Sequence, residues 1–234
     1  MTTLAERQDL ALRHPSPPLA VLAAVHVVLF LASIAVTAAI NGGEHIPSLS
    51  GRISEVVAFF FAEPTAMRWN AFLLLGSAVP LLLFSAVVSS RLAFLGLQAA
   101  GVTIGFAGGL VAAAALGLSA LVEWVLSATA PSQESSRGLQ LLFFGMGGPL
   151  HVMALGLLLA GVSVTSRLAR LLPDWLTSFG LVVAVIAELT WLVLVVPEAA
   201  LLLPVARLAS YVWLIAVGVL LPESVSPRAP GGTA

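Results

Sequence analysis

Long runs of apolar residues dominate the chain, and they are separated by short polar segments rich in proline, glycine and arginine. A helix needs about 20 apolar residues to cross a hydrocarbon core about 30 Å thick. A spanning segment must also be helical, because an open strand would leave its backbone N–H and C=O groups without partners in lipid. The pattern predicts six transmembrane helices, over residues 19–40, 70–89, 92–118, 139–162, 175–196 and 199–221.

Proline and glycine mark the ends of these runs. Pro18 precedes the first run, Gly42 follows it, and Pro222 closes the last. The sequence therefore predicts an N-terminal tail over residues 1–18, one all-α transmembrane domain over 19–222, and a disordered C-terminal tail over 223–234. The first run, about 22 residues, is longer than the apolar core of a signal peptide, about 7–15 residues, so we interpret it as a span.

Two segments do not fit simple spans. Residues 51–64 mix apolar residues with charged ones, which favours a short helix lying on the outer membrane surface; a re-entrant segment is the alternative. The third run continues beyond what a span needs, to Glu123 and Trp124. We expect that helix to project past the lipid, with Trp124 at the interface. Glu123 and Glu198 should then be solvated.

Composition identifies the medium. Hydrophobic residues make up 59% of the chain and charged residues 9%, against about 25% charged in a soluble domain. We therefore expect the lipid bilayer to be the principal partner. A net charge of −1 gives no basic face for nucleic acid. The chain has no cysteine, which excludes disulfides and thiolate ligands, and we expect neither a metal nor a cofactor.

Arginine placement predicts the orientation. All ten basic residues are arginine, and alanine, glycine and proline are abundant, as in proteins encoded by GC-rich bacterial genomes. With the N-terminus inside, the inner segments hold six arginines and the outer segments three, if Arg207 is treated as intramembrane. The positive-inside rule then favours a bacterial cytoplasmic membrane protein with both termini cytoplasmic.

A stripe of small residues lies on the third predicted helix. Gly101, Gly105 and Gly109 are four residues apart, so they share one helix face on which another backbone can approach closely. Two interpretations are open. The stripe packs against helices of the same bundle, or it mediates a homodimer or a contact with other membrane subunits.

The fourth predicted helix contains a helix break. Gly147, Gly148 and Pro149 lie near its middle, and proline removes a backbone donor and clashes with the preceding turn. We expect a kink or a short unwound segment. In transporters such breaks expose backbone groups that bind ions or substrates, although a simple kink without a ligand is the alternative.

Three ionisable residues form a candidate intramembrane polar cluster. Glu188 and Arg207 each lie about eight residues from the outer end of adjacent helices, or roughly 12 Å deep. We expect them to form an ion pair; the alternative is that each snorkels to the surface. His151, near the midplane, could join them and relay protons. His26 lies at a different depth, so the two histidines are a weak signal for haem or metal.

The C-terminal half, over residues 139–222, resembles a family of uncharacterised bacterial six-helix membrane proteins that is known only as a domain of unknown function. The resemblance rests on Phe144-Gly145, Gly148-Pro149-Leu150, residues 154–161, Arg167, Leu171, Leu172, Pro173, Trp175 and residues 213–218. It implies a six-helix fold and supplies no catalytic residue.

The sequence carries no recognisable motif of a hydrolase, a zinc protease or a phosphate-binding enzyme. We therefore expect a non-enzymatic membrane component, such as a subunit, a scaffold or a sensor, that acts through helix contacts. The alternative is a small transporter or channel that uses the broken fourth helix and the His151, Glu188 and Arg207 cluster. An intramembrane enzyme has the least support.

Overall fold

A computed structural model describes residues 12–40, 64–128 and 133–225 of the chain. Six of its helices are long and apolar enough to cross a membrane. The predicted all-α transmembrane bundle is thus confirmed. The predicted outer surface helix, apart from Pro64 at its end, lies outside the described residues.

The helices follow one another in an up-and-down order. The elements are β1 (Leu12–Arg13), α2 (Leu19–Ile40), α4 (Pro64–Phe94), α5 (Ala100–Ala128), α6 (Gln133–Gly145), the π-helical turn η1 (Met146–Leu150), α7 (His151–Leu168), α8 (Asp174–Glu188), the 3-10 helices η2 (Leu189–Leu194) and η3 (Pro197–Leu201), α9 (Leu202–Leu220) and β2 (Ser224–Val225). α6, η1 and α7 form one continuous rod, which is the fourth predicted span.

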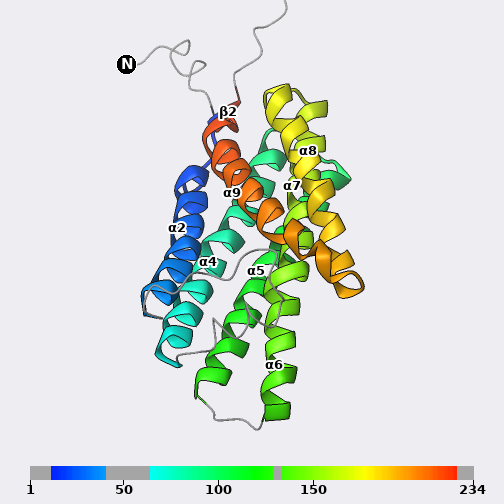
Figure 1. Cartoon of the computed structure of the whole chain (residues 1–234). Helices are drawn as coiled ribbons and strands as arrows, with labels where there is room; N and C mark the ends of the chain where they lie inside the picture. The colour runs from blue at the N-terminus through cyan, green and yellow to red at the C-terminus, as the bar shows by residue number, and fades with distance from the viewer. Residues whose placement is uncertain (1–11, 41–63, 129–132, 226–234) are drawn as a thin grey trace, which may run out of the picture.

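The bundle closes on itself. α4 packs between α2 and α5, α7 packs between α5 and α8, and α9 contacts both α8 and α2. The described chain ends meet at one end of the bundle (Figure 1). We call the half of the bundle near these ends the terminal half; it holds Leu19, Phe94, Ala100, Leu168, Asp174 and Leu220. The opposite, distal half holds Ile40, Pro64, Ala128, Gln133, Leu194 and Leu202.

The turn between the second and third spans lies later than the sequence predicted. α4 continues to Phe94 and α5 begins at Ala100, whereas the predicted spans met at residues 89–92. The turn contains Gly96, whose φ of 86° is a left-handed conformation that glycine adopts without strain. Arg91, which falls between the predicted spans 70–89 and 92–118, is a buried residue in the last turn of α4.

The predicted disorder of the C-terminal tail from residue 223 onwards is wrong for its first residues. Ser224 and Val225 pair antiparallel with Arg13 and Leu12. Arg91 holds this region, because its guanidinium donates to Leu221 O at 3.4 Å, to Glu223 Oε1 at 3.5 Å and to Ser16 Oγ at 3.2 Å. One buried arginine thus attaches both tails to the bundle.

The glycine stripe packs inside the bundle. A Cβ on Gly161 of α7 would overlap the backbone of Gly101 and Gly105 of α5, and a Cβ on Gly108 would lie 2.6 Å from Leu158 N. Gly109 faces Ser85 of α4. Of the two interpretations of the stripe, the structure supports packing between α5 and its own neighbours, and the face considered for a homodimer is covered by α7 and α4.

Tryptophans lie exposed towards both ends of the bundle. Trp69, Trp124 and Trp191 are exposed in the distal half, and Trp175 is exposed at the opposite end, beside the start of α8. Exposed tryptophans at helix ends are typical of the two membrane–water interfaces. The positions agree with a bilayer whose normal runs along the bundle.

Candidate functional site

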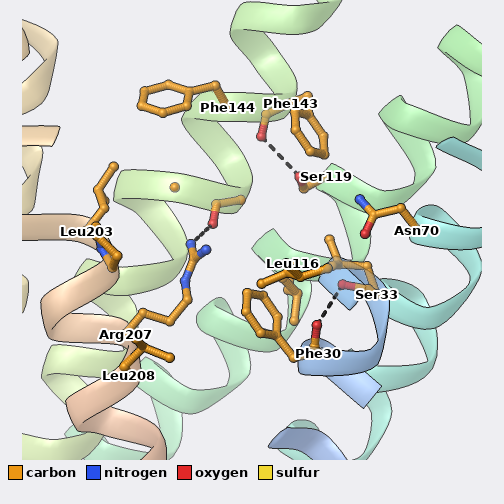
Figure 2. Close-up of a pocket in the computed structure, with 15 residues that line it drawn as sticks. Phe30, Ser33, Asn70, Leu116, Ser119, Phe143, Phe144, Leu203, Arg207 and Leu208 are labelled. Carbon is orange, nitrogen blue, oxygen red and sulfur yellow. Dashed lines mark hydrogen bonds between the residues drawn. The ribbon is translucent and has the colours of Figure 1, made fainter. Parts of the chain in front are cut away.

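The distal half contains a half-enclosed cavity of about 280 Å³. Five helical segments line it: α2, α4, α5, the α6–η1 rod and α9. Most of the lining is apolar, and the lining residues are Phe30, Ser33, Ile34, Asn70, Leu74, Leu116, Ser119, Phe143, Phe144, Gly147, Gly148, Leu203, Pro204, Arg207 and Leu208. Figure 2 shows Arg207, Leu203 and Leu208 on one wall, with Ser33, Ser119 and Asn70 across from them.

The helix break lies in this wall. At Gly147, Gly148 and Pro149 the rod departs from α-helical geometry in the π-helical turn η1 and is not unwound. In a regular α-helix the N–H of His151 would bond to Gly147 O. Here it bonds to the carbonyls of Met146 and Gly148 instead. The change makes the Gly147 carbonyl available to a side chain.

Arg207 forms a hydrogen bond with that carbonyl. Its Nη2 donates to Gly147 O, as Figure 2 shows. The guanidinium carbon also lies 5.1 Å from the centre of the Phe30 ring, where a cation is attracted to the face of an aromatic ring. Its Nε is buried and has no hydrogen-bond partner. Among the described residues, no carboxylate lies within ion-pair distance of Arg207.

The predicted ion pair between Glu188 and Arg207 is therefore wrong. Glu188 Oε1 lies against Gly156 of α7, about 3.2 Å from the position that a Cβ there would take. Arg207 instead faces the π-turn. The two residues are both in the distal half, but helical rotation points them at different neighbours.

The donor groups of the other polar side chains in the lining are engaged by the bundle, while Asn70 Oδ1 is buried without a partner. Ser33 donates to Phe30 O at 2.7 Å, and Ser119 donates to Phe143 O at 3.0 Å. The Asn70 amide donates to both oxygens of Glu123, at 2.8 and 2.9 Å. Arg207 is the single ionisable residue among the described residues of the lining. It is also the lining side chain that keeps N–H donors without an acceptor.

The prediction that Glu123 is solvated is wrong, because its side chain is fully buried between α5 and α4. α4 begins at Pro64, six residues before the predicted span, so Asn70 lies within the helix and faces Glu123. Glu198, the other residue expected to be solvated, is exposed.

The structure places His151 next to the cavity rather than in its lining. His151 is fully buried, and its Nδ1 lies 2.9 Å from Ala112 O. His26, left out of the predicted cluster, has a similar contact of 2.9 Å between Nδ1 and Ser77 O. A neutral imidazole that faces a carbonyl with Nδ1 carries its proton there. Each Nε2 is then an acceptor, and both are buried without a partner.

Aromatic rings connect Arg207 to His26, because the guanidinium lies over the Phe30 ring and Tyr211 contacts both Phe30 and His26. The single tyrosine of the chain, Tyr211, packs edge-on against the rings of His26 and Phe30 at 5.0 and 5.1 Å. Its buried hydroxyl has no partner either. In place of the predicted cluster of His151, Glu188 and Arg207, the structure brings Arg207 together with Phe30, Tyr211 and His26. His151 contacts the backbone of α5 instead.

Within the described ranges, no three His, Asp or Glu side chains converge as a metal site would require.

Sequence analysis did not single out Asn70, Tyr211 or the buried role of Arg91. For Asn70 a signal existed. It lies six residues after the start of α4, and Glu123 lies five before the end of α5. A hairpin with long helices therefore puts the two at one level. For Tyr211 and Arg91 the sequence offers no comparable signal, since each depends on contacts with distant segments.

Comparisons of the chain with protein-family models, with curated proteins and with solved structures give no match. The resemblance to an uncharacterised six-helix family accordingly stays an expectation.

Proposed function

We propose that this chain is a non-enzymatic, multi-pass component of the bacterial cytoplasmic membrane, with both termini cytoplasmic, that binds an apolar molecule in its distal cavity. Of the three roles considered, subunit, scaffold and sensor, a binding cavity favours a sensor or a regulatory subunit. The chain would act by changing its helix contacts when the cavity is filled.

One observation carries this proposal: the cavity occupies the distal half, whereas a continuous core fills the terminal half. Leu81 and Phe84 of α4, Leu155 and Leu158 of α7 and Trp213 of α9 are fully buried in that core. Protein interiors of this kind are as densely packed as organic crystals. A molecule can therefore enter the distal half and remain there without a path across the bundle.

The test is native mass spectrometry of the detergent-purified protein. We expect a non-covalently bound small molecule on the wild type. Leu116→Trp should displace it, because Leu116 is 1% exposed and lines the cavity. The matched control is Leu118→Trp, because Leu118 lies on the same helix but is 49% exposed; this variant should keep the molecule. A wild type without bound molecule, or equal occupancy in a folded Leu116→Trp variant, would contradict the proposal.

A small carrier is the second candidate, and the position of the π-turn favours it. Gly147 and Gly148 line the cavity, and Arg207 binds the carbonyl that the turn releases. A proton carrier of this design would use His151, which directly follows the π-turn and whose Nε2 is buried without a partner. Vesicles that contain the protein and an internal pH dye distinguish the two functions. The carrier predicts a proton flux under an imposed potential that His151→Gln abolishes, whereas a sensor predicts the rate of protein-free vesicles.

A further inference from the structure

No acid of the described helices neutralises the charge of Arg207. A cation inside a bilayer is costly and usually pairs with an acid or marks a site. Arg207 has one backbone acceptor and one aromatic face, and its Nε–H is buried without an acceptor. No carboxylate of the described chain reaches it, since Glu188 lies against Gly156 and Glu123 accepts from Asn70. Among residues 12–40, 64–128 and 133–225, the charge of Arg207 therefore has no counter-charge.

The donors of Arg207 suit a planar anion. A guanidinium presents five N–H groups in a fixed plane that matches the two oxygens of a carboxylate. Gly147 O takes one of these donors. Ser33 and Ser119 donate to backbone carbonyls, and both histidines present unprotonated Nε2 atoms. Arg207 is thus the group on this side of the cavity that can bind a negative charge.

The rest of the cavity suits a single hydrocarbon chain. Its walls are formed mainly by Leu74, Leu116, Phe143, Phe144 and Leu203. Its volume of about 280 Å³ is at the lower limit of small-molecule sites, about 300–1,000 Å³. One chain segment fits such a space better than the two chains of a phospholipid. Leu208 lines the cavity and is 51% exposed, so the site reaches the outer surface of α9.

We infer that the cavity binds a long-chain carboxylate, with the carboxylate on Arg207 and the acyl chain along the apolar walls. This inference rests on the proposed function, because it names the class of molecule that the cavity receives. The unpaired arginine within an otherwise apolar cavity is the juxtaposition that carries it.

The experiment measures how tightly the full chain in detergent binds palmitate and hexadecanol. The two probes differ in the charge of the headgroup, and at about pH 8 carboxylic acids are ionised. We expect palmitate to bind the wild type. Arg207→Gln should weaken palmitate binding about tenfold or more, because hydrogen bonds to a charged group are lost. Arg207→Lys, which keeps the charge but not the planar fork, should give an intermediate affinity. The control Arg167→Gln replaces an exposed arginine and should bind as the wild type does.

Three results would contradict the carboxylate ligand, the single acyl chain or the cavity function, and they can be told apart. If hexadecanol binds as tightly as palmitate, and both bind Arg207→Gln equally, the anion is wrong while the cavity function stands. If dipalmitoyl phosphatidic acid displaces palmitate and itself depends on Arg207, the ligand is a two-chain phospholipid. If neither single-chain probe binds and Leu116→Trp changes nothing, the proposed function itself fails. Gel filtration and circular dichroism of each variant show whether it is folded.

Discussion

The two halves of the bundle each contain a buried or half-buried arginine, and these arginines differ in whether a described acid pairs with them. In the terminal half, Arg91 is 1% exposed and has an acidic partner, Glu223, together with Ser16 and Leu221 O. In the distal half, Arg207 has a carbonyl and a phenyl ring. The first half supplies its own counter-charge, because the chain ends are present there. The described residues of the second half supply no counter-charge, and this is the position that we propose for the carboxylate of a ligand.

The surroundings of individual glycines also vary along the bundle. In the terminal half, Gly108 and Gly161 bring α5 and α7 into backbone contact. In the distal half, a Cβ on Gly138 or Gly145 would meet nothing within 4 Å, whereas a Cβ on Gly147 would lie 2.5 Å from Ser119 Oγ. The effect of a glycine in a membrane helix therefore depends on whether another helix lies opposite it.

The largest effect is expected from Gly161→Ala. The new methyl group would overlap the backbone of α5, which cannot move aside as a side chain can. Overpacking of a core typically costs about 1–3 kcal/mol, and we expect the upper end of this range. The measurement is the thermal unfolding midpoint in detergent. Gly138→Ala is the matched control and should leave the midpoint unchanged or slightly raise it. Equal unfolding midpoints for Gly161→Ala and Gly138→Ala would show that the two glycines do not differ in how closely another helix packs against them.

Arg91→Gln should have the next largest effect. It removes charge-assisted hydrogen bonds that join the two tails to α4, at a cost of about 2 kcal/mol. Limited proteolysis should cut the tails faster, and the unfolding midpoint should fall. Arg170→Gln, which changes an exposed arginine in the same half, is the control. Unaltered cleavage of Arg91→Gln would show that the tails are held by other contacts.

Arg207→Met should change stability little, within about 1 kcal/mol, in contrast to Arg91→Gln. An uncompensated charge is lost along with one hydrogen bond, and replacing buried ionic groups with apolar ones of similar volume is often neutral or stabilising. Chemical or thermal unfolding without added ligand checks this. A loss as large as that of Arg91→Gln would mean that Arg207 is structural and not held for a ligand.

The smallest effect is expected for the coupling between Glu188 and Arg207. Since they face different neighbours, Glu188→Gln and Arg207→Gln should be nearly additive, with a coupling energy below about 0.5 kcal/mol in a double-mutant cycle. Unfolding free energies of the two single variants and the double variant give this value. A coupling above about 1 kcal/mol would restore the ion pair that the sequence suggested.

The sequence by itself determined the medium, the helix count and the position of the break in the fourth span. Apolar runs of the first and fourth spans must be helical in lipid whatever their neighbours are, so α2 has the predicted bounds and the π-turn lies at Gly147, Gly148 and Pro149. These features depend on local chemistry: the hydropathy of a run, and the donor that proline lacks.

The tertiary structure alone decided which polar groups meet. Sequence spacing gives the depth of a residue, but the direction in which it points depends on how each helix rotates to pack. Glu188 and Arg207 share a half of the bundle and point apart, whereas Glu123, which was expected to be solvated, meets Asn70 in the interior. The cavity follows for the same reason, because a space between five helices is a property of their arrangement and is encoded in no single segment.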